Sequence, residues 1–196
     1  MGGVAVCCQL KAFSPRSQVV LGNDKEVITM KELIEKALNE AIDTLVRADF
    51  ELLQQNVHER SICHRLAIYL EPYFPGWNID CEYNRNRNVS KRLERLMEKL
   101  NIPPEIKIDD TQPPTVFPDI IIHRRNTNKN LLVIEMKKTS SRVIDEFDLG
   151  KLEAFKSLLH YQFAAFIKIR TGEDYDIGTN NVEITLTAAD IGKRCR

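Results

Sequence analysis

Apolar residues recur between Thr29 and Val46 at steps of three and four, which places them on one face of a helix. The hydroxyl of Thr29 and the carboxylate of Glu32, three residues later, are the two halves of a capping box. The pattern predicts an amphipathic helix that begins at Thr29 and packs its apolar face on the core or on a second subunit. Residues 1–28 have no sustained period and predict a loosely attached extension or a single edge strand.

A second helical stretch runs to about Leu70, with Asp49 as its expected N-cap and Pro72 just beyond its end. Within it, Glu59 shares a stripe with the apolar residues Ile62, Cys63 and Leu66. Because that stripe is expected to turn inward, Glu59 is a candidate for a site at the protein interior; the alternative is a solvated glutamate on the helix surface.

Short apolar or alternating runs, bounded by turn residues, follow in the remaining two thirds of the chain. They predict strands over residues 77–83, 116–123, 131–137, 163–169 and 182–187, with helices over residues 90–100 and 148–160. Four prolines make residues 101–115 an extended loop. The order of these elements predicts an α/β protein.

Charged residues interrupt the two most apolar strands, which form a predicted hairpin. Asp119 stands near the start of the first strand, and Glu135 and Lys137 stand at the end of the second. If the turn centres on Thr127, Asp119 lies directly opposite Glu135, with Cβ atoms roughly 4.5–5.5 Å apart. Two such carboxylates repel each other and raise one pKa, which a divalent cation between them would relieve. The hairpin therefore predicts a metal site. The alternative without a function is a surface hairpin whose charged residues lie at the strand ends.

The chain resembles the PD-(D/E)xK nuclease superfamily, whose signature matches Pro118-Asp119 followed by Glu135-Met136-Lys137. It resembles more narrowly an uncharacterised prokaryotic group within it, over residues 77–85, 118–125 and 132–138. This likeness implies a restriction-endonuclease-like αβββαβ core with a mixed sheet flanked by helices, plus an N-terminal helical extension. The expected domains are residues 1–48, the extension and its helix, and residues 49–196, the nuclease-like domain.

The resemblance also implies the chemistry. Asp119, Glu135 and the Met136 main-chain carbonyl match the metal ligands of the family, with Glu59 as an additional candidate. Mg²⁺ suits a sparse oxygen site, and Mn²⁺ is expected to substitute for it. Lys137 would orient the attacking water or offset charge that develops on the phosphoryl oxygens.

Basic residues near this motif are candidates for binding a phosphate backbone, although each could equally be a solvated charge. They are Arg85, Arg87, Lys91, Arg92, Arg95, Arg124, Arg125, Lys129, Lys138, Arg142 and Lys151. Lys151, Asp148 and Tyr161 are also candidates for lining the substrate side, although Asp148 is explained at least as well as a helix cap. His123 is expected to be structural or to contact a phosphate.

Amino-acid composition excludes fewer classes of function than the Asp119, Glu135 and Lys137 motif indicates. The 28 basic and 28 acidic residues cancel, so net charge alone does not indicate nucleic-acid binding. Five cysteines without a C-x-x-C spacing predict neither a disulfide framework nor a zinc site and favour a reduced, cytoplasmic compartment. No apolar run could span a membrane, no phosphate-binding glycine motif predicts a nucleotide cofactor, and His58 and His64 are wrongly spaced for a zinc protease.

The sequence thus predicts a magnesium-dependent endonuclease that hydrolyses phosphodiester bonds, with DNA as the expected substrate. The alternative is a catalytically silent nuclease fold that serves as a DNA-binding or assembly module. A homodimer is also open, because two copies would suit cleavage of both strands of a duplex.

Overall fold

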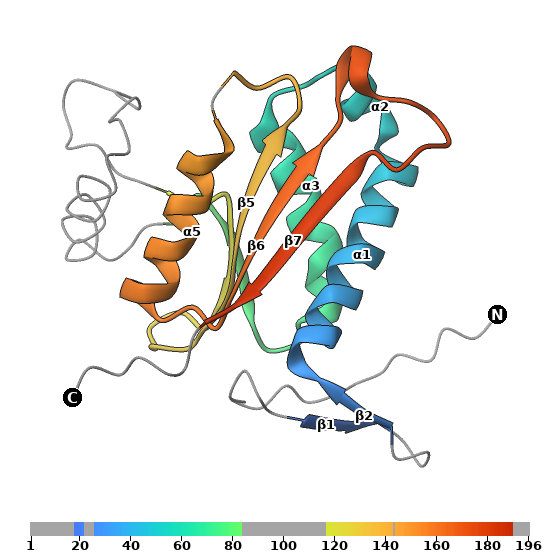
Figure 1. Cartoon of the computed structure of the whole chain (residues 1–196). Coiled ribbons are helices and arrows are strands. Elements are labelled where there is room, and N and C mark those ends of the chain that lie inside the picture. Colours follow the sequence, from blue (N-terminus) through green and yellow to red (C-terminus); the bar gives the residue numbers. More distant parts are fainter. Residues whose placement is uncertain (1–17, 22–25, 84–116, 143, 190–196) are drawn as a thin grey trace.

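The computed structural model describes residues 18–21, 26–83, 117–142 and 144–189 (Figure 1). The predicted helix at residues 90–100 and the loop at residues 101–115 lie outside these ranges. Within them the protein is a mixed α/β structure whose five-stranded sheet is flanked by helices.

The sheet has the order β3-β4-β5-β6-β7. Its strands are β3 (Asn78–Cys81), β4 (Ile120–His123), β5 (Asn130–Lys138), β6 (Phe163–Ile169) and β7 (Val182–Ala188). All neighbours are antiparallel except β5 and β6, which are parallel and are connected through helix α5 (Asp145–Leu159). This long connection is the one that a parallel pair requires.

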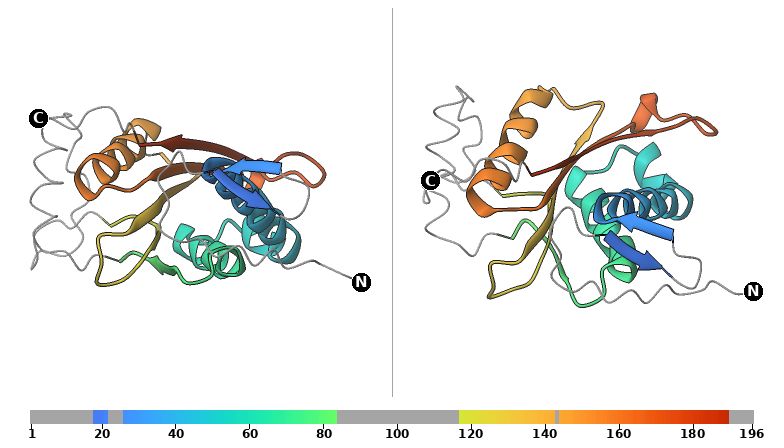
Figure 2. Two further views of the ribbon diagram at one scale, coloured as in Figure 1. Left: turned by 90° about the horizontal axis from the view of Figure 1, so that it is seen from below. Right: turned by 60° about the horizontal axis from the view of Figure 1, so that its bottom comes forward.

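Helices cover both faces of the sheet. Helices α1 (Met30–Ala48) and α3 (Glu59–Leu70) lie on one face and α5 lies on the other (Figure 2). Side chains of β5 alternate between the two cores: Ile134 and Met136 belong to the larger core with α1 and α3, and Val133 belongs to the smaller core with α5. Both faces are therefore buried, as the continuous apolar runs predicted.

Helix α1 begins as the sequence predicted. The main-chain N–H of Thr29 donates to Glu32 Oε2 at 2.7 Å, and the N–H of Glu32 donates to Thr29 Oγ1 at 3.3 Å, which confirms the capping box. Its apolar face packs on the core of the same chain, where Leu38 and Leu45 are fully buried.

The helix predicted from Asp49 to Leu70 is wrong as one element, because it breaks into α2 (Phe50–Gln54) and α3. Asn56 adopts a left-handed conformation at φ 50° between them, which asparagine tolerates better than most residues. His58 is the N-cap of α3 and accepts a hydrogen bond from the N–H of Arg60 at 3.3 Å. Asp49 does not cap through its side chain; it accepts hydrogen bonds from Arg65 Nε and Tyr69 Oη at 2.7 and 2.6 Å instead.

Other boundaries differ less. Two antiparallel strands, β1 (Gln18–Leu21) and β2 (Glu26–Thr29), form a separate small sheet where a loose extension or one strand was expected. Helix α5 begins at Asp145 rather than Asp148, and β4 begins only at Ile120. Short 3₁₀ turns, η1 (Glu71–Tyr73) and η2 (Gly172–Asp174), complete the described elements. None of the helices in the described ranges has the length and apolarity to cross a bilayer.

Candidate functional site

The hairpin register matches the prediction. Ile120 pairs with Ile134, Ile121 with Val133 and Ile122 with Leu132, and extending this register by one residue places Asp119 opposite Glu135. Asp119 lies just before β4, and its Oδ2 accepts a hydrogen bond from the Met136 N–H at 2.7 Å. The carboxylate of Asp119 thus satisfies a strand N–H that no β4 residue pairs with, and this contact fixes its orientation.

Glu135 and Lys137 project toward α5, which supplies two further charged groups. Lys151 Nζ lies 2.6 Å from Glu135 Oε2 and 3.2 Å from Asp148 Oδ1. Asp148 Oδ2 in turn accepts a hydrogen bond from Lys137, whose ammonium also donates to the Ile144 carbonyl at 2.9 Å. The result is a buried chain of alternating charges, Glu135–Lys151–Asp148–Lys137.

These four paired charges change what was expected of Lys137, Lys151 and Asp148. Lys137, expected to orient the attacking water or to offset phosphoryl charge, has its ammonium bound to Asp148 and to the Ile144 carbonyl. Lys151, expected among the residues that bind nucleic acid, is only 6% exposed and bonded to Glu135, so its ammonium lies inside the site and not on a surface. Asp148 is not a helix cap, because α5 begins three residues earlier and Ile144 is its N-cap. The sequence did not reveal these pairs because they depend on how α5 packs against β5.

Glu59 approaches the same end of the sheet from the opposite face. It is the first residue of α3, and its Oε2 accepts a hydrogen bond from the Lys138 N–H at 3.0 Å. The ammonium of Lys138 donates to the Val57 carbonyl at 2.9 Å, so β5 binds the turn before α3 through both groups. Glu59 is therefore positioned by the end of β5, as the sequence predicted for an inward-facing residue.

The electrostatics at this end of the sheet are unfavourable for carboxylates. Burial raises the pKa of Glu135 well above its ordinary value, and repulsion from Asp119 adds to the effect against the pull of Lys151. Burial likewise raises the pKa of Asp119, and burial together with repulsion from Asp119 raises that of Glu59. Burial alone would lower the pKa of Lys151, but Glu135, Asp148 and Asp119 together raise it. The Lys151 ammonium is shared between Glu135 and Asp148, so it does not fully offset the charge of Asp119 and Glu135.

The donor set fits a divalent cation in part. The residues described by the structure include no group of three or more His, Cys, Asp or Glu side chains arranged to hold a metal ion. Yet Glu135 Oε1 is buried and has no hydrogen-bond partner among those residues, and the Asp119 carboxylate lies beside it. Two carboxylates completed by main-chain oxygen and water suit Mg²⁺, which keeps several waters when bound. Glu59 is already engaged by Lys138, so the fit rests on Asp119 and Glu135.

Met136 was predicted to offer its carbonyl as a third ligand. Its N–H holds Asp119, and its side chain packs in the larger core with its Sδ 3.8 Å from Cys63 Sγ. Met136 therefore orients the Asp119 carboxylate through its N–H and packs β5 on the larger core through its side chain. Its carbonyl remains a candidate ligand.

A pocket of about 190 Å³ opens beside Asp119. It is lined by Arg60, Cys63, Cys81, Glu82 and Asp119. Arg60 and Glu82 form an ion pair across it, and Glu82 has a left-handed backbone at φ 49° while its N–H donates to the Asp119 carbonyl at 3.3 Å. Residues in such conformations often mark functional sites. Arg60 belongs to no motif, and Glu82 lies within residues 77–85 of the resemblance without matching a predicted site residue.

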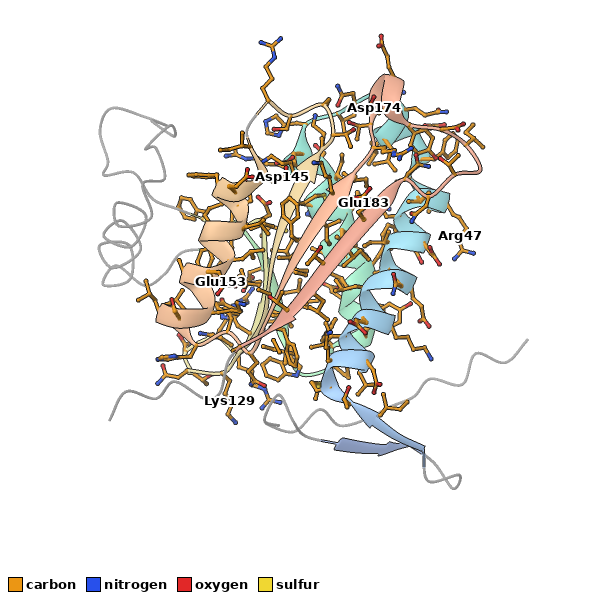
Figure 3. The ribbon with its side chains drawn as sticks, in the orientation of Figure 1. Arg47, Lys129, Asp145, Glu153, Asp174 and Glu183 are labelled. Atoms are coloured by element: carbon orange, nitrogen blue, oxygen red, sulfur yellow. The ribbon has the colours of Figure 1, made fainter. Side chains whose placement is uncertain are left out.

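The basic residues of the hairpin tip do not lie near the site. Arg124 follows the end of β4, five extended residues or about 17 Å from Asp119, and stacks 5.1 Å from the Trp77 ring. Arg125 forms an ion pair with Asp80. Lys129 at the tip and Asp145 at the start of α5 lie at opposite ends of the molecule (Figure 3). A shared contact of the tip and the metal site with one stretch of phosphate backbone would have to span this distance, and it stays a prediction.

The remaining candidates divide into three groups. His123 is buried with Nε2 2.8 Å from Asp80 Oδ2, and Tyr161 is buried with its ring edge against Phe155, so both are structural. Arg142 is exposed in the loop between β5 and α5, at the site end. Arg85, Arg87, Lys91, Arg92 and Arg95 lie outside the described residues.

Comparison of the chain with protein-family models, with curated proteins and with solved structures found no match. The functional assignment consequently depends on the residues of this chain and their geometry.

Proposed function

We propose that the protein is a divalent-metal-dependent endonuclease of the PD-(D/E)xK type, with a restriction-endonuclease-like core and DNA as its substrate. The observation that carries the proposal is the pairing of the half-buried Asp119 carboxylate with the fully buried Glu135 carboxylate through the hairpin register, with Glu135 Oε1 lacking a partner among the described residues. A protein that buries two repelling carboxylates gains no stability from them unless a cation or proton neutralises them.

Asp119 and Glu135 would hold the cation, with the Met136 carbonyl and water as further oxygen ligands. When bound, a divalent ion would lower the pKa of a water molecule and offset negative charge on the scissile phosphate. The Met136 N–H keeps the Asp119 carboxylate turned toward the strand end. Lys137 bonds Asp148 and the Ile144 carbonyl, and it therefore positions the start of α5, including Lys151, against the carboxylates.

The pocket beside Asp119 would admit the substrate phosphate. Arg60 lies in its wall and forms an exposed ion pair with Glu82, which is the weak kind of pair that a phosphate can displace. Arg142, exposed in the loop before α5, is a second candidate for phosphate contact from the same end.

A catalytically silent module that binds DNA is the second candidate, and one observation favours it. Lys151 already neutralises Glu135, and Lys137 neutralises Asp148, so the charged groups largely satisfy one another without a cation. Binding and cleavage must therefore be measured separately.

The experiment is cleavage of plasmid, linear, single-stranded and branched DNA by the full chain with Mg²⁺ or Mn²⁺. Wild type is compared with Asp119→Asn and Lys137→Met, and with Lys156→Met as a control near the C-terminal end of α5. We expect wild type and Lys156→Met to cut, Asp119→Asn to lose at least about a hundredfold in rate, and chelator to stop the reaction. Equal cleavage by wild type and Asp119→Asn would refute the assignment, and DNA binding without cleavage would favour the silent module.

A further inference from the structure

Lys151 lies among carboxylates rather than beside a single partner. Its ammonium is 2.6 Å from Glu135 Oε2 and 3.2 Å from Asp148 Oδ1, and Asp119 also attracts it. The side chain is buried and lies 5.4 Å from the Phe147 ring centroid, so hydrocarbon and aromatic surface keep water away from it. Such a buried ammonium persists only because the carboxylates compensate the loss of hydration.

The two oxygens of Glu135 differ in their surroundings. Oε2 accepts the Lys151 hydrogen bond, whereas Oε1 has no partner among the described residues. A divalent cation bound between Glu135 and Asp119 would lie a few ångströms from the Lys151 ammonium. Two positive charges at that separation in a poorly hydrated site repel strongly.

Asp148 gives Lys151 a second place to pair. Because Asp148 contacts both Lys151 and Lys137, Lys151 can keep one carboxylate partner when Glu135 turns toward a cation. The exchange leaves no charge of this chain buried without a partner.

We propose that Lys151 is an internal counter-ion that competes with the divalent cation for Glu135 and thereby sets the affinity of the site for metal. The inference rests on the proposed metal site. It makes a prediction of unusual sign. Removing a residue that merely supports the site would weaken metal binding, whereas removing a competitor tightens it.

The test is the dissociation constant of Mn²⁺ alone, measured by calorimetry on the full chain without DNA. Lys151→Met removes the charge and keeps most of the side-chain volume, and Lys151→Gln removes the charge while keeping a hydrogen-bond donor for Glu135. Lys156→Met, also on α5 and paired with Glu153 at 2.6 Å, makes the same change in net charge away from the site. Near-ultraviolet circular dichroism checks that each variant folds. If Lys151→Met does not fold, the Mn²⁺ affinity of Lys151→Gln decides the test.

We expect both Lys151 variants to bind Mn²⁺ about tenfold more tightly than wild type, and Lys156→Met to stay within about twofold. Unchanged or weaker binding by the Lys151 variants overturns the inference, as does a lack of Mn²⁺ binding by all proteins. The outcome is separable from the nuclease proposal. Tighter binding in a protein that cuts no DNA supports the inference alone, and cleavage with unchanged Mn²⁺ affinity overturns the inference alone.

Discussion

The carboxyl groups of Glu59, Asp119 and Glu135 lie toward one end of the sheet, and each has a pKa above its ordinary value because of burial. Repulsion from a second carboxylate adds to the effect in every case. In the protein without metal, such groups contribute stability that is complete below their unfolded-state pKa values and is lost as the pH rises through the higher folded-state values. A cation that binds the deprotonated groups would restore that stability.

We therefore predict that stabilisation by Mg²⁺ increases with pH. At a Mg²⁺ concentration about 100 times Kd, the gain is about 2.7 kcal/mol, or an increase in Tm of roughly 5 to 10 °C, at about pH 8. At about pH 5 the gain is smaller because protons compete for the same oxygens. Thermal unfolding followed by circular dichroism, with Mg²⁺ and with chelator, measures both values. Asp119→Asn serves as the control, and an equal Mg²⁺ effect at the two pH values would contradict the prediction.

The sequence could predict that Asp119 lies opposite Glu135, but it could not predict which carboxylates Lys137 and Lys151 bind. The Asn-rich turn fixes the hairpin register, and the register alone brings Asp119 opposite Glu135. The partner of Glu135 depends instead on the position of Lys151 along α5 and on how that helix lies against β5. Sequence spacing specifies neither quantity, so it could not predict the pair of Lys151 with Glu135 or the pair of Lys137 with Asp148.

At the scale of elements, the turn between α2 and α3 determines where Glu59 lies. Asn56 occupies it in a left-handed conformation, and its Oδ1 accepts hydrogen bonds from Thr171 Oγ1 at 2.9 Å and Ser140 Oγ at 3.2 Å. The Lys138 ammonium binds the next carbonyl, that of Val57. The sequence did not predict this turn, because the apolar residues keep a helical spacing through it. Helix α2 ends before Asn56 and α3 begins after His58, and no glycine or proline marks the position.

Asn56→Ala should therefore destabilise the fold by about 1 to 3 kcal/mol, through backbone strain and two lost hydrogen bonds, and should also weaken Mn²⁺ binding. Asn126, at φ 60° in the exposed hairpin tip, provides a matched control. Asn126→Ala is expected to cost stability but to leave Mn²⁺ affinity unchanged. Denaturant unfolding and calorimetry give the two quantities, and equal loss of Mn²⁺ affinity in both variants would argue against a positioning role for the turn.

Across the whole molecule, the site lies at the end of the sheet where β5 ends and α5 begins, and the hairpin tip lies at the other end (Figure 3). The sequence predicted the strands on both sides of the hairpin, but it did not show that side chains at the tip are held by β3. The ion pair of Asp80 with Arg125 and the contact of Asp80 with His123 instead link the tip to β3. The tip arginines are thus part of the structure of the sheet edge.

Charge reversal at the two ends should consequently have different effects on DNA binding. We predict that Arg142→Glu weakens binding by about three- to tenfold and reduces the dependence of affinity on salt, because it removes a phosphate contact near the site. Lys129→Glu makes the same change of net charge at the tip and is expected to alter affinity by less than about twofold. Fluorescence anisotropy with labelled duplex DNA at several salt concentrations, in the presence of chelator, compares them. A larger effect of Lys129→Glu would place the DNA at the other end of the molecule.

Anomalous scattering from crystals grown with Mn²⁺ is the most direct test of whether Asp119 and Glu135 hold a divalent cation. We predict one anomalous peak between the Asp119 carboxylate and Glu135 Oε1, with Lys151 Nζ moved from Glu135 toward Asp148. A peak elsewhere, or Lys151 still bonded to Glu135 without a peak beside it, would show that the two carboxylates do not form a metal site.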